Sequence, residues 1–186
     1  TVTYNENPTI TCPAAATGNT SDDGSGNCTT TVSIGTPTTG DNCSVSGVIA
    51  QVGGVTINPA TYLFPIGVTT VTWIVTDGSG NTASCTQNVT VTDNEAPTFT
   101  APANDIICRN GDCTYNINVS ETGDVTDEND NCATGINATY SDNETGAADC
   151  DKAGIVIRTW TLLDGNGNSV SHQQIIYVNP KPSIIV

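Results

Sequence analysis

The sequence contains an internal repeat, and this repeat constrains the fold more than any other feature. Residues 1–11, T-V-T-Y-N-E-N-P-T-I-T, match residues 90–100, T-V-T-D-N-E-A-P-T-F-T, at an offset of 89. The tripeptide Asp-Asn-Cys at 41–43 returns at 130–132 with the same offset. Repeats of this length form whole domains, so the sequence predicts two tandem domains over residues 1–93 and 94–181.

A third copy of the repeat is expected at the end of the chain. Pro182-Ser183-Ile184 resembles Pro8-Thr9-Ile10 and Pro97-Thr98-Phe99 in sequence. Residues 182–186 are therefore predicted to begin a following repeat, which makes the chain a piece of a longer array.

Short alternating runs of Thr, Val and Ile predict β-strands, because alternation places every second side chain on one face of a sheet. Clusters of Gly, Asn, Asp and Pro separate the runs. The segments 77–81 and 164–168 predict hairpin loops, and Trp73 and Trp160 are the expected core anchors. The expected strands cover residues 29–34, 48–52, 68–76, 82–92, 115–119, 136–140, 155–163 and 169–178. The predicted fold class is all-β, with two tandem immunoglobulin-like β-sandwich domains stapled by disulfides.

Eight cysteines are scattered singly through the chain, and only 5% of the residues are aromatic. A small domain with few large apolar groups has a thin core and needs another source of stability. An even number of cysteines predicts disulfides formed in an oxidising compartment. The sequence does not indicate zinc, because it has no C-x-x-C pair and His172 is its only histidine.

The repeat suggests how the cysteines pair. Cys28 and Cys113 open equivalent runs, so each is expected to bond to a cysteine shortly upstream. In the second domain Ala101 takes the position of Cys12 and His172 that of Cys85, which leaves one pairing there to elimination. Bridges between domains would lock the array and are not expected. The predicted bridges are Cys12–Cys28, Cys43–Cys85, Cys108–Cys113 and Cys132–Cys150.

The charge of the chain excludes several classes of partner. The formal net charge is −15, from 19 acidic and 4 basic residues. Such a surface repels phosphate backbones and anionic lipid headgroups, so neither nucleic acid nor direct membrane insertion is expected. There is no run of about 18 apolar residues that could span a bilayer. The chain is instead expected to attract cations.

The first domain resembles the hyalin-repeat (HYR) family over its full length. The resemblance lies in P-T-I-T-C-P-A at 8–14, D-N-C at 41–43, F-P-I-G-V-T-T-V-T at 64–72 and D-G-S-G-N-T-A-S-C at 77–85. The second domain is a divergent relative, since D-K-A-G at 151–154 replaces the F-P-x-G stretch. Its D-N-C, D-C and D-G-N-G-N segments are similar to repeats in large Bacteroidota cell-surface adhesins of the SprB gliding type. The resemblance implies display on the cell surface, adhesion and a role in gliding motility.

Acidic residues cluster where the chain is expected to enter each domain. In an immunoglobulin-like sandwich, the B–C and F–G loops lie at one end, together with the incoming linker. Carboxylates held that close repel one another, and a Ca²⁺ ion with about six to eight oxygen ligands removes the conflict. The expected ligands in the second domain and its linker are Asp93, Asn94, Glu95, Asp124, Asp127, Glu128, Asp130 and Asp164. A weaker site is expected from Glu6, Asp41 and Asp77.

The linker segment at 93–99, D-N-E-A-P-T-F, is also similar to the calcium-binding linker of cadherins over a few residues. The alternative to calcium is a solvated acidic hinge in which the Asp side chains cap their own turns. A rise in melting temperature with Ca²⁺ would separate the two interpretations.

The leading functional hypothesis is a structural and adhesive module of a long extracellular fibre. Its expected partners are the neighbouring repeats of the same chain and, as adhesion target, a surface polysaccharide or another external surface. The alternative is a carbohydrate-binding module of a secreted protein, which would need exposed aromatic side chains. No catalytic centre is predicted, because the acids lie in turn-forming loops and no cysteine is left as a nucleophile.

Overall fold

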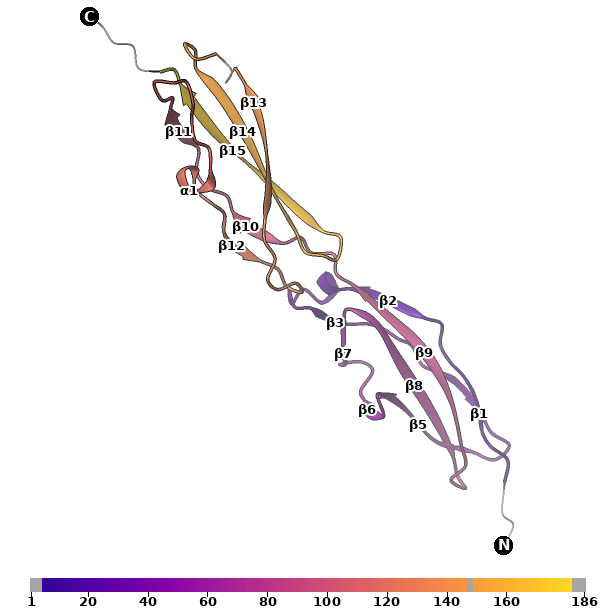
Figure 1. Cartoon of the computed structure of the whole chain (residues 1–186). Helices are drawn as coiled ribbons and strands as arrows, with labels where there is room; N and C mark the ends of the chain where they lie inside the picture. The colour runs from indigo at the N-terminus through magenta and orange to yellow at the C-terminus, as the bar shows by residue number, and fades with distance from the viewer. Residues whose placement is uncertain (1–4, 147–148, 182–186) are drawn as a thin grey trace, which may run out of the picture. The chain divides into compact units, whose positions relative to one another are not determined.

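The computed structural model describes residues 5–146 and 149–181, and the chain divides into two compact units, Thr1–Asn94 and Glu95–Val186 (Figure 1). Both units are built from β-strands, which confirms the all-β prediction. The predicted start of a third repeat at 182–186 lies outside the described residues. These units are the first and the second domain.

The first domain centres on one five-stranded sheet in the order β2-β9-β8-β5-β6. The long strands β8 and β9 form a hairpin, and β2 runs parallel to β9 at the sheet edge. Two smaller antiparallel pairs, β1–β4 and β3–β7, complete the domain. The strand bounds are β1 Thr9–Thr11, β2 Ala16–Asn19, β3 Thr29–Thr31, β4 Thr38–Gly40, β5 Val45–Val52, β6 Val55–Ile57, β7 Leu63–Pro65, β8 Gly67–Asp77 and β9 Thr82–Thr92, with a 3₁₀ turn η1 at Thr20–Asp23.

The first core forms because alternate residues of β8 and β9 point to one face of the sheet. Val71, Trp73 and Val89 are buried there and pack with Phe64 of β7 and Val32 after β3. Burial of the Trp73 indole requires a partner for its N–H group, and Nε1 donates to Gln87 Oε1 at 2.9 Å. Trp73 is therefore a core anchor, as predicted.

The second domain repeats this plan with fewer strands. Its four-stranded sheet has the order β11-β15-β14-β13. Strand β11 runs parallel to β15, as β2 does to β9 in the first domain, and β10 pairs with β12. The bounds are β10 Thr98–Thr100, β11 Asp105–Cys108, β12 Thr126–Asn129, β13 Thr139–Thr145, β14 Gly154–Leu163 and β15 Ser169–Asn179, with one helical turn α1 at Val119–Thr122.

Trp160 anchors the second core, as predicted, with Phe99 and Leu162 beside it. The second domain also buries a charged side chain. Arg158 of β14 is 1% exposed and donates from Nε and Nη2 to both carboxylate oxygens of Asp142 at 2.8 Å. Its guanidinium also donates to Thr122 Oγ1 at 2.9 Å and to the Ile117 carbonyl at 2.6 Å. At the offset of the two tryptophans, this position is Val71 in the first domain.

Most of the expected strands are present, and both predicted hairpin loops join the long strand pairs β8–β9 and β14–β15. The expected strand at 115–119 is wrong, since no strand forms there and α1 begins at Val119. The backbone of this segment bonds to side chains instead. The Ile117 carbonyl accepts from Arg158, and the hydroxyl of Thr122 donates to the Asn118 carbonyl at 3.2 Å.

The predicted disulfide pairing is wrong. The structure joins Cys12 to Cys85 across the first domain, which contradicts Cys12–Cys28 and Cys43–Cys85. It joins Cys113 to Cys150 in the second domain, which contradicts Cys108–Cys113 and Cys132–Cys150. Cys28 and Cys132 are also disulfide-bonded, whereas Cys43 and Cys108 are free and exposed.

The pairing differs from the prediction because the folded sheet, and not proximity in the sequence, brings the bonded cysteines together. Cys12 follows β1, and Cys85 lies on β9 opposite Trp73, with both sulfur-bearing side chains packed against the first core. The sequence did contain the signal for this pair. The second domain has lost both partners together, with Ala101 in place of Cys12 and His172 in place of Cys85. His172 instead packs edge-on against Phe99, with ring centroids 4.9 Å apart.

Candidate metal centre

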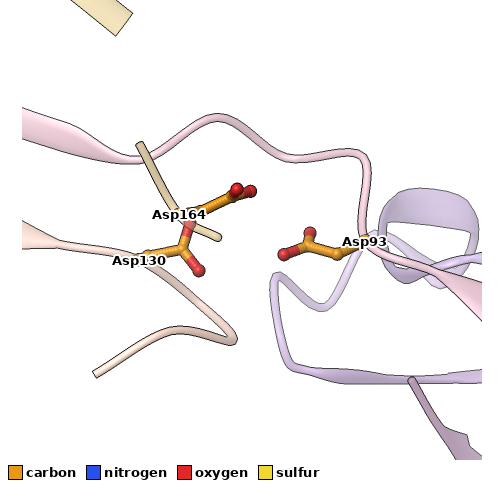
Figure 2. A group of neighbouring side chains, drawn as sticks. All are labelled: Asp93, Asp130 and Asp164. Carbon is orange, nitrogen blue, oxygen red and sulfur yellow. The ribbon is translucent and has the colours of Figure 1, made fainter. Parts of the chain in front are cut away.

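Three carboxylates from separate segments converge in the described part of the chain (Figure 2). Asp93 follows β9 in the linker, Asp130 follows β12 and Asp164 follows β14. One carboxylate oxygen from each residue lies within 4.8 Å of the other two. These three residues were among the ligands predicted from the sequence, and the structure brings them together.

Asp164 is fixed by the hairpin loop that it opens. Its Oδ1 accepts hydrogen bonds from the N–H groups of Asn166, Gly167 and Asn168 at 2.7, 3.0 and 3.0 Å. Its Oδ2 accepts from Asn168 Nδ2 at 2.5 Å. Burial raises the pKa of Asp164, but these hydrogen bonds together outweigh burial and hold the pKa below the usual range. The side chain is thus an anion at neutral pH although it is only 5% exposed.

Asp130 presents an oxygen that has no partner among the described residues. Its Oδ2 accepts from the N–H groups of Cys132 and Ala133 at 2.8 and 2.7 Å, which sets the orientation of the carboxylate. Its Oδ1 is buried without a hydrogen bond, and so is Oδ1 of the neighbouring Asn131. Buried acceptors of this kind are rare and call for an unseen donor or cation.

The linker residues Asp93 and Asn94 form hydrogen bonds with Thr20 of the first domain. The Thr20 hydroxyl lies 3.2 Å from Asp93 Oδ1 and 3.5 Å from Asn94 Oδ1. The Ser21 N–H also donates to Asn94 Oδ1 at 3.3 Å. Because the side-chain oxygen of Asn94 already accepts hydrogen bonds from η1, Asn94 is a poorer candidate for a metal ligand than Asp93. Asp93 is 5% exposed, and its carboxylate lies within reach of the other two.

The remaining ligand candidates of the second domain have other contacts. Glu95 accepts from Asn131 Nδ2 at 2.5 Å, and Glu128 accepts from the Ala138 N–H at 2.5 Å. Asp124 accepts from the Val125 N–H at 2.8 Å, next to it in the chain. Asp127 lies 3.4 Å from the Thr100 hydroxyl. The close group of carboxylates in the described residues does not include these four.

The first domain carries the same loop chemistry at equivalent positions. Asp41 Oδ2 accepts from the N–H groups of Cys43 and Ser44 at 2.8 and 2.9 Å, and its Oδ1 is buried without a partner among the described residues. Asp77 caps its hairpin loop through the Asn81 side chain at 2.7 Å, and this bond, with backbone N–H groups, lowers the pKa of Asp77.

Glu6 accepts from the Asn42 amide, as Glu95 does from Asn131. The acidic loops of the two domains differ in sequence at one position that could supply a ligand to a cation. At the offset of 89 residues, Asp93 corresponds to Tyr4. The described residues of the first domain do not form a close group of three carboxylates.

The donor set fits a hard divalent cation. Two unit negative charges about 5 Å apart repel by roughly 3 kcal/mol at an effective dielectric of 20. Ca²⁺ binds oxygen at about 2.3–2.6 Å, so two of its ligands are at most about 5 Å apart. Oxygens within 4.8 Å of one another meet this limit without backbone movement. Sulfur or imidazole ligands would be expected for zinc, and this group has neither.

Comparison with known proteins gives the family of the first domain. Residues 5–91 match the HYR domain family, and this domain is a HYR domain. Over 137 residues, the chain is 31% identical to hyalin of Strongylocentrotus purpuratus, a match that covers 73% of the chain but only 11% of hyalin. The chain therefore spans about a tenth of that relative.

Solved structures of similar fold include the EC1-4 region of Drosophila N-cadherin, with a TM-score of 0.44 and 14% identity over 95% of this chain and 50% of that one. Another is a SusE-like surface-located polysaccharide-binding protein of Bacteroides thetaiotaomicron, with a TM-score of 0.29 and 14% identity over 92% of this chain and 34% of that one. Likeness at this level does not bear on function. Within the described residues, no helix has the length and apolar character to cross a membrane.

Proposed function

We propose that this chain is a non-catalytic structural and adhesive module of a long extracellular protein, and that Ca²⁺ bound at Asp93, Asp130 and Asp164 stiffens it. The observation that carries the proposal is the convergence of these three carboxylates, two of them 5% exposed, with a buried oxygen of Asp130 left without a partner. A merely solvated acidic hinge would leave its carboxylates in water and would not require them to approach one another.

The hydrogen bonds around the site give calcium a mechanical role. Asp93 is held by Thr20 of the first domain, while Asp130 and Asp164 are fixed by backbone N–H groups in loops of the second. An ion that binds all three carboxylates would therefore remove freedom from the linker, which without such a restraint lets tandem domains move relative to each other. In an array, restraint at each junction converts a flexible chain into a stiff one.

The HYR domain supports the extracellular and adhesive part of the proposal, as do the disulfides and the acidic surface. The setting in a Bacteroidota adhesin of the SprB gliding type remains part of the proposal, and so does attachment to a polysaccharide or another external surface. A carbohydrate-binding module would stack sugar rings on exposed aromatics. Trp73 and Trp160 are 4% and 1% exposed, so neither can serve in that way, and among the described residues the exposed aromatics are the two tyrosines Tyr140 and Tyr177.

Thermal unfolding with Ca²⁺ and with chelator tests the proposal. A free Ca²⁺ concentration 100 times the dissociation constant stabilises the folded state by about 2.7 kcal/mol. In a domain of about 90 residues each kcal/mol shifts the melting temperature by roughly 4–8 °C, so the second domain should melt about 10–20 °C higher. A melting curve that stays unchanged up to millimolar Ca²⁺ would refute the calcium site.

Two matched variants locate the effect. Asp164→Asn removes one carboxylate of the group but keeps an acceptor for the loop, and it should abolish most of the shift. Asp77→Asn makes the same change in the equivalent loop of the first domain and should leave the shift of the second domain intact. If both variants retain the shift, or both lose it, calcium does not bind where we place it.

A further inference from the structure

Each domain buries a tryptophan and a glutamine at equivalent positions of its long strands. Trp73 and Gln87 of the first domain correspond to Trp160 and Gln174 of the second at an offset of 87 residues. All four side chains are at most 4% exposed. An indole N–H and a side-chain amide are costly to bury without partners, so each of their polar atoms is expected to form a hydrogen bond.

In the first domain the two side chains bond directly to each other. Trp73 Nε1 donates to Gln87 Oε1 at 2.9 Å. Gln87 Nε2 donates to the carbonyls of Ala14 and Ile34 at 2.6 and 3.0 Å. The glutamine therefore connects Trp73 of the sheet to the two segments that contain Ala14 and Ile34, and its oxygen and nitrogen both have partners.

In the second domain the same pair is incomplete. Gln174 Nε2 again donates to two carbonyls, those of Ala103 and Thr122, at 2.9 and 2.6 Å. Trp160 Nε1 and Gln174 Oε1, however, are both buried without a hydrogen-bond partner among the described residues. One donor and one acceptor are therefore left in the second domain at the positions where the first domain has a direct bond.

Rotation of the Gln174 amide does not supply the missing partner. Both hydrogens of Nε2 are used by the carbonyls of Ala103 and Thr122, so exchanging Oε1 with Nε2 would place Oε1 against two other acceptors. Oε1 thus remains an acceptor that needs a donor, whereas Trp160 Nε1 can only donate. A molecule that both accepts and donates would satisfy the two atoms together.

The sequence difference that accompanies the missing bond is Arg158. It occupies the position of Val71, an aliphatic residue buried in the first core, and lies opposite Gln174 in the register of β14 and β15. Its guanidinium donates to Thr122 Oγ1 at 2.9 Å, and the Thr122 carbonyl accepts from Gln174. The guanidinium carbon lies 5.7 Å from the centre of the Trp160 ring. A large polar group thus lies beside the tryptophan and the glutamine in the second domain alone.

We propose that Arg158 separates Trp160 from Gln174 and that the second core binds one water molecule between them. The water accepts a hydrogen bond from Trp160 Nε1 and donates one to Gln174 Oε1. Buried waters typically make about three hydrogen bonds. Arg158 Nη1 gives one of its two hydrogens to Thr122 and has a second for the water. The water restores, through one bridge, the connection that Trp73 makes directly to Gln87.

The chemistry of the pair selects water over other small ligands. The positive charge of Arg158 beside the pair would repel a cation. Gln174 Oε1 is an acceptor and would repel an anion. Water is neutral and both donates and accepts, and it is the usual partner of buried polar groups that the protein itself leaves unpaired.

NMR of the full chain tests the proposal, with the first domain as an internal control. The chain has two tryptophans, so Trp73→Phe and Trp160→Phe variants assign the two indole N–H resonances. We expect a rotating-frame cross-peak between the Trp160 N–H and water, with the sign of a dipolar contact and not of hydrogen exchange. Trp73, which donates to Gln87, should show none. Absence of the Trp160 cross-peak, or equal cross-peaks for both indoles, would overturn the proposal.

Arg158→Val tests the cause, because it places the first-domain residue in the second domain. We expect Trp160 to bond directly to Gln174 in this variant and the water cross-peak to disappear. A cross-peak that persists would overturn the role given to Arg158.

A crystal structure of the unaltered chain, at a resolution that shows ordered water, decides the matter without any variant. We expect one water about 2.7–3.2 Å from both Trp160 Nε1 and Gln174 Oε1. A direct bond between these two atoms, or electron density with no water between them, would overturn the proposal.

Discussion

Removal of the Cys12–Cys85 bridge should be the most destabilising change available in the first domain that leaves its large core side chains in place. The bond closes a loop with a sequence separation of 73 residues. A crosslink over a loop of that length lowers the entropy of the unfolded chain enough to stabilise the domain by about 4 kcal/mol. Single domains are stable by only about 5–15 kcal/mol, so the Cys12→Ala/Cys85→Ala double variant should lose a large share of its stability.

Urea unfolding followed by tryptophan fluorescence can measure this loss in one domain at a time. The chain has two tryptophans, one in each core, so a Trp160→Phe background leaves Trp73 as the reporter of the first domain. Cys43→Ala, which removes a free exposed cysteine of the same domain, is the matched control and should change the free energy of unfolding by less than about 0.5 kcal/mol. A double variant that loses under about 1 kcal/mol would refute the loop-closure reasoning.

Further predictions concern the second domain. Asp142→Ala should destabilise it by about 3–5 kcal/mol, because it leaves the buried Arg158 guanidinium without its counter-ion, whereas Arg158→Met should cost less because the Asp142 side chain, 19% exposed, can reach water. Equal losses in urea unfolding would contradict this order. The Thr114 hydroxyl and N–H hydrogen-bond to Asp112 and lower the pKa of its carboxyl, so NMR titration should place its midpoint below the usual value of about 3.9. The stabilisation from this carboxylate is then present above pH 4 and is lost as the pH falls through the lowered pKa, and a midpoint above 4 would contradict it.

The strands and the hairpins could be predicted from the sequence because their signal is local. Alternation in 82–92 and 155–163 places every second side chain on one face, and the Asp-Gly-x-Gly-Asn segments have the residues that such loops require. The segment 115–119 alternates equally well but is not a strand. The Asn118 carbonyl bonds to the nearby Thr122 hydroxyl, and the Ile117 carbonyl bonds to Arg158, which only the folded domain brings close.

The candidate site could be predicted in part for a similar reason. Asp130 and Asp164 follow strands β12 and β14 of the second domain, and Asp93 follows β9, so each acid is expected at a strand end from its place in the sequence. Selection among the acids depends on where the folded loops hold each carboxylate, since Asp130 and Asp164 accept hydrogen bonds from their own loops and also lie in the close group. The sequence shows Asp124 and Asp130 alike as loop acids, and only the structure separates their roles.

The disulfides could not be predicted from spacing because the bonded cysteines are far apart in the chain. The joint replacement of Cys12 by Ala101 and of Cys85 by His172 was a better guide than proximity. A second domain that lost only one of the two would have kept an unpaired thiol beside its core.

A crystal structure of this chain grown with Ca²⁺ tests the central claim most directly. We predict one ion, identified by its anomalous scattering, with oxygen ligands from Asp93, Asp130 and Asp164 at about 2.3–2.6 Å. Oδ1 of Asp130, buried without a partner among the described residues, should be among them. A structure at millimolar Ca²⁺ with only water between these carboxylates, or with the ion bound elsewhere, would contradict the claim.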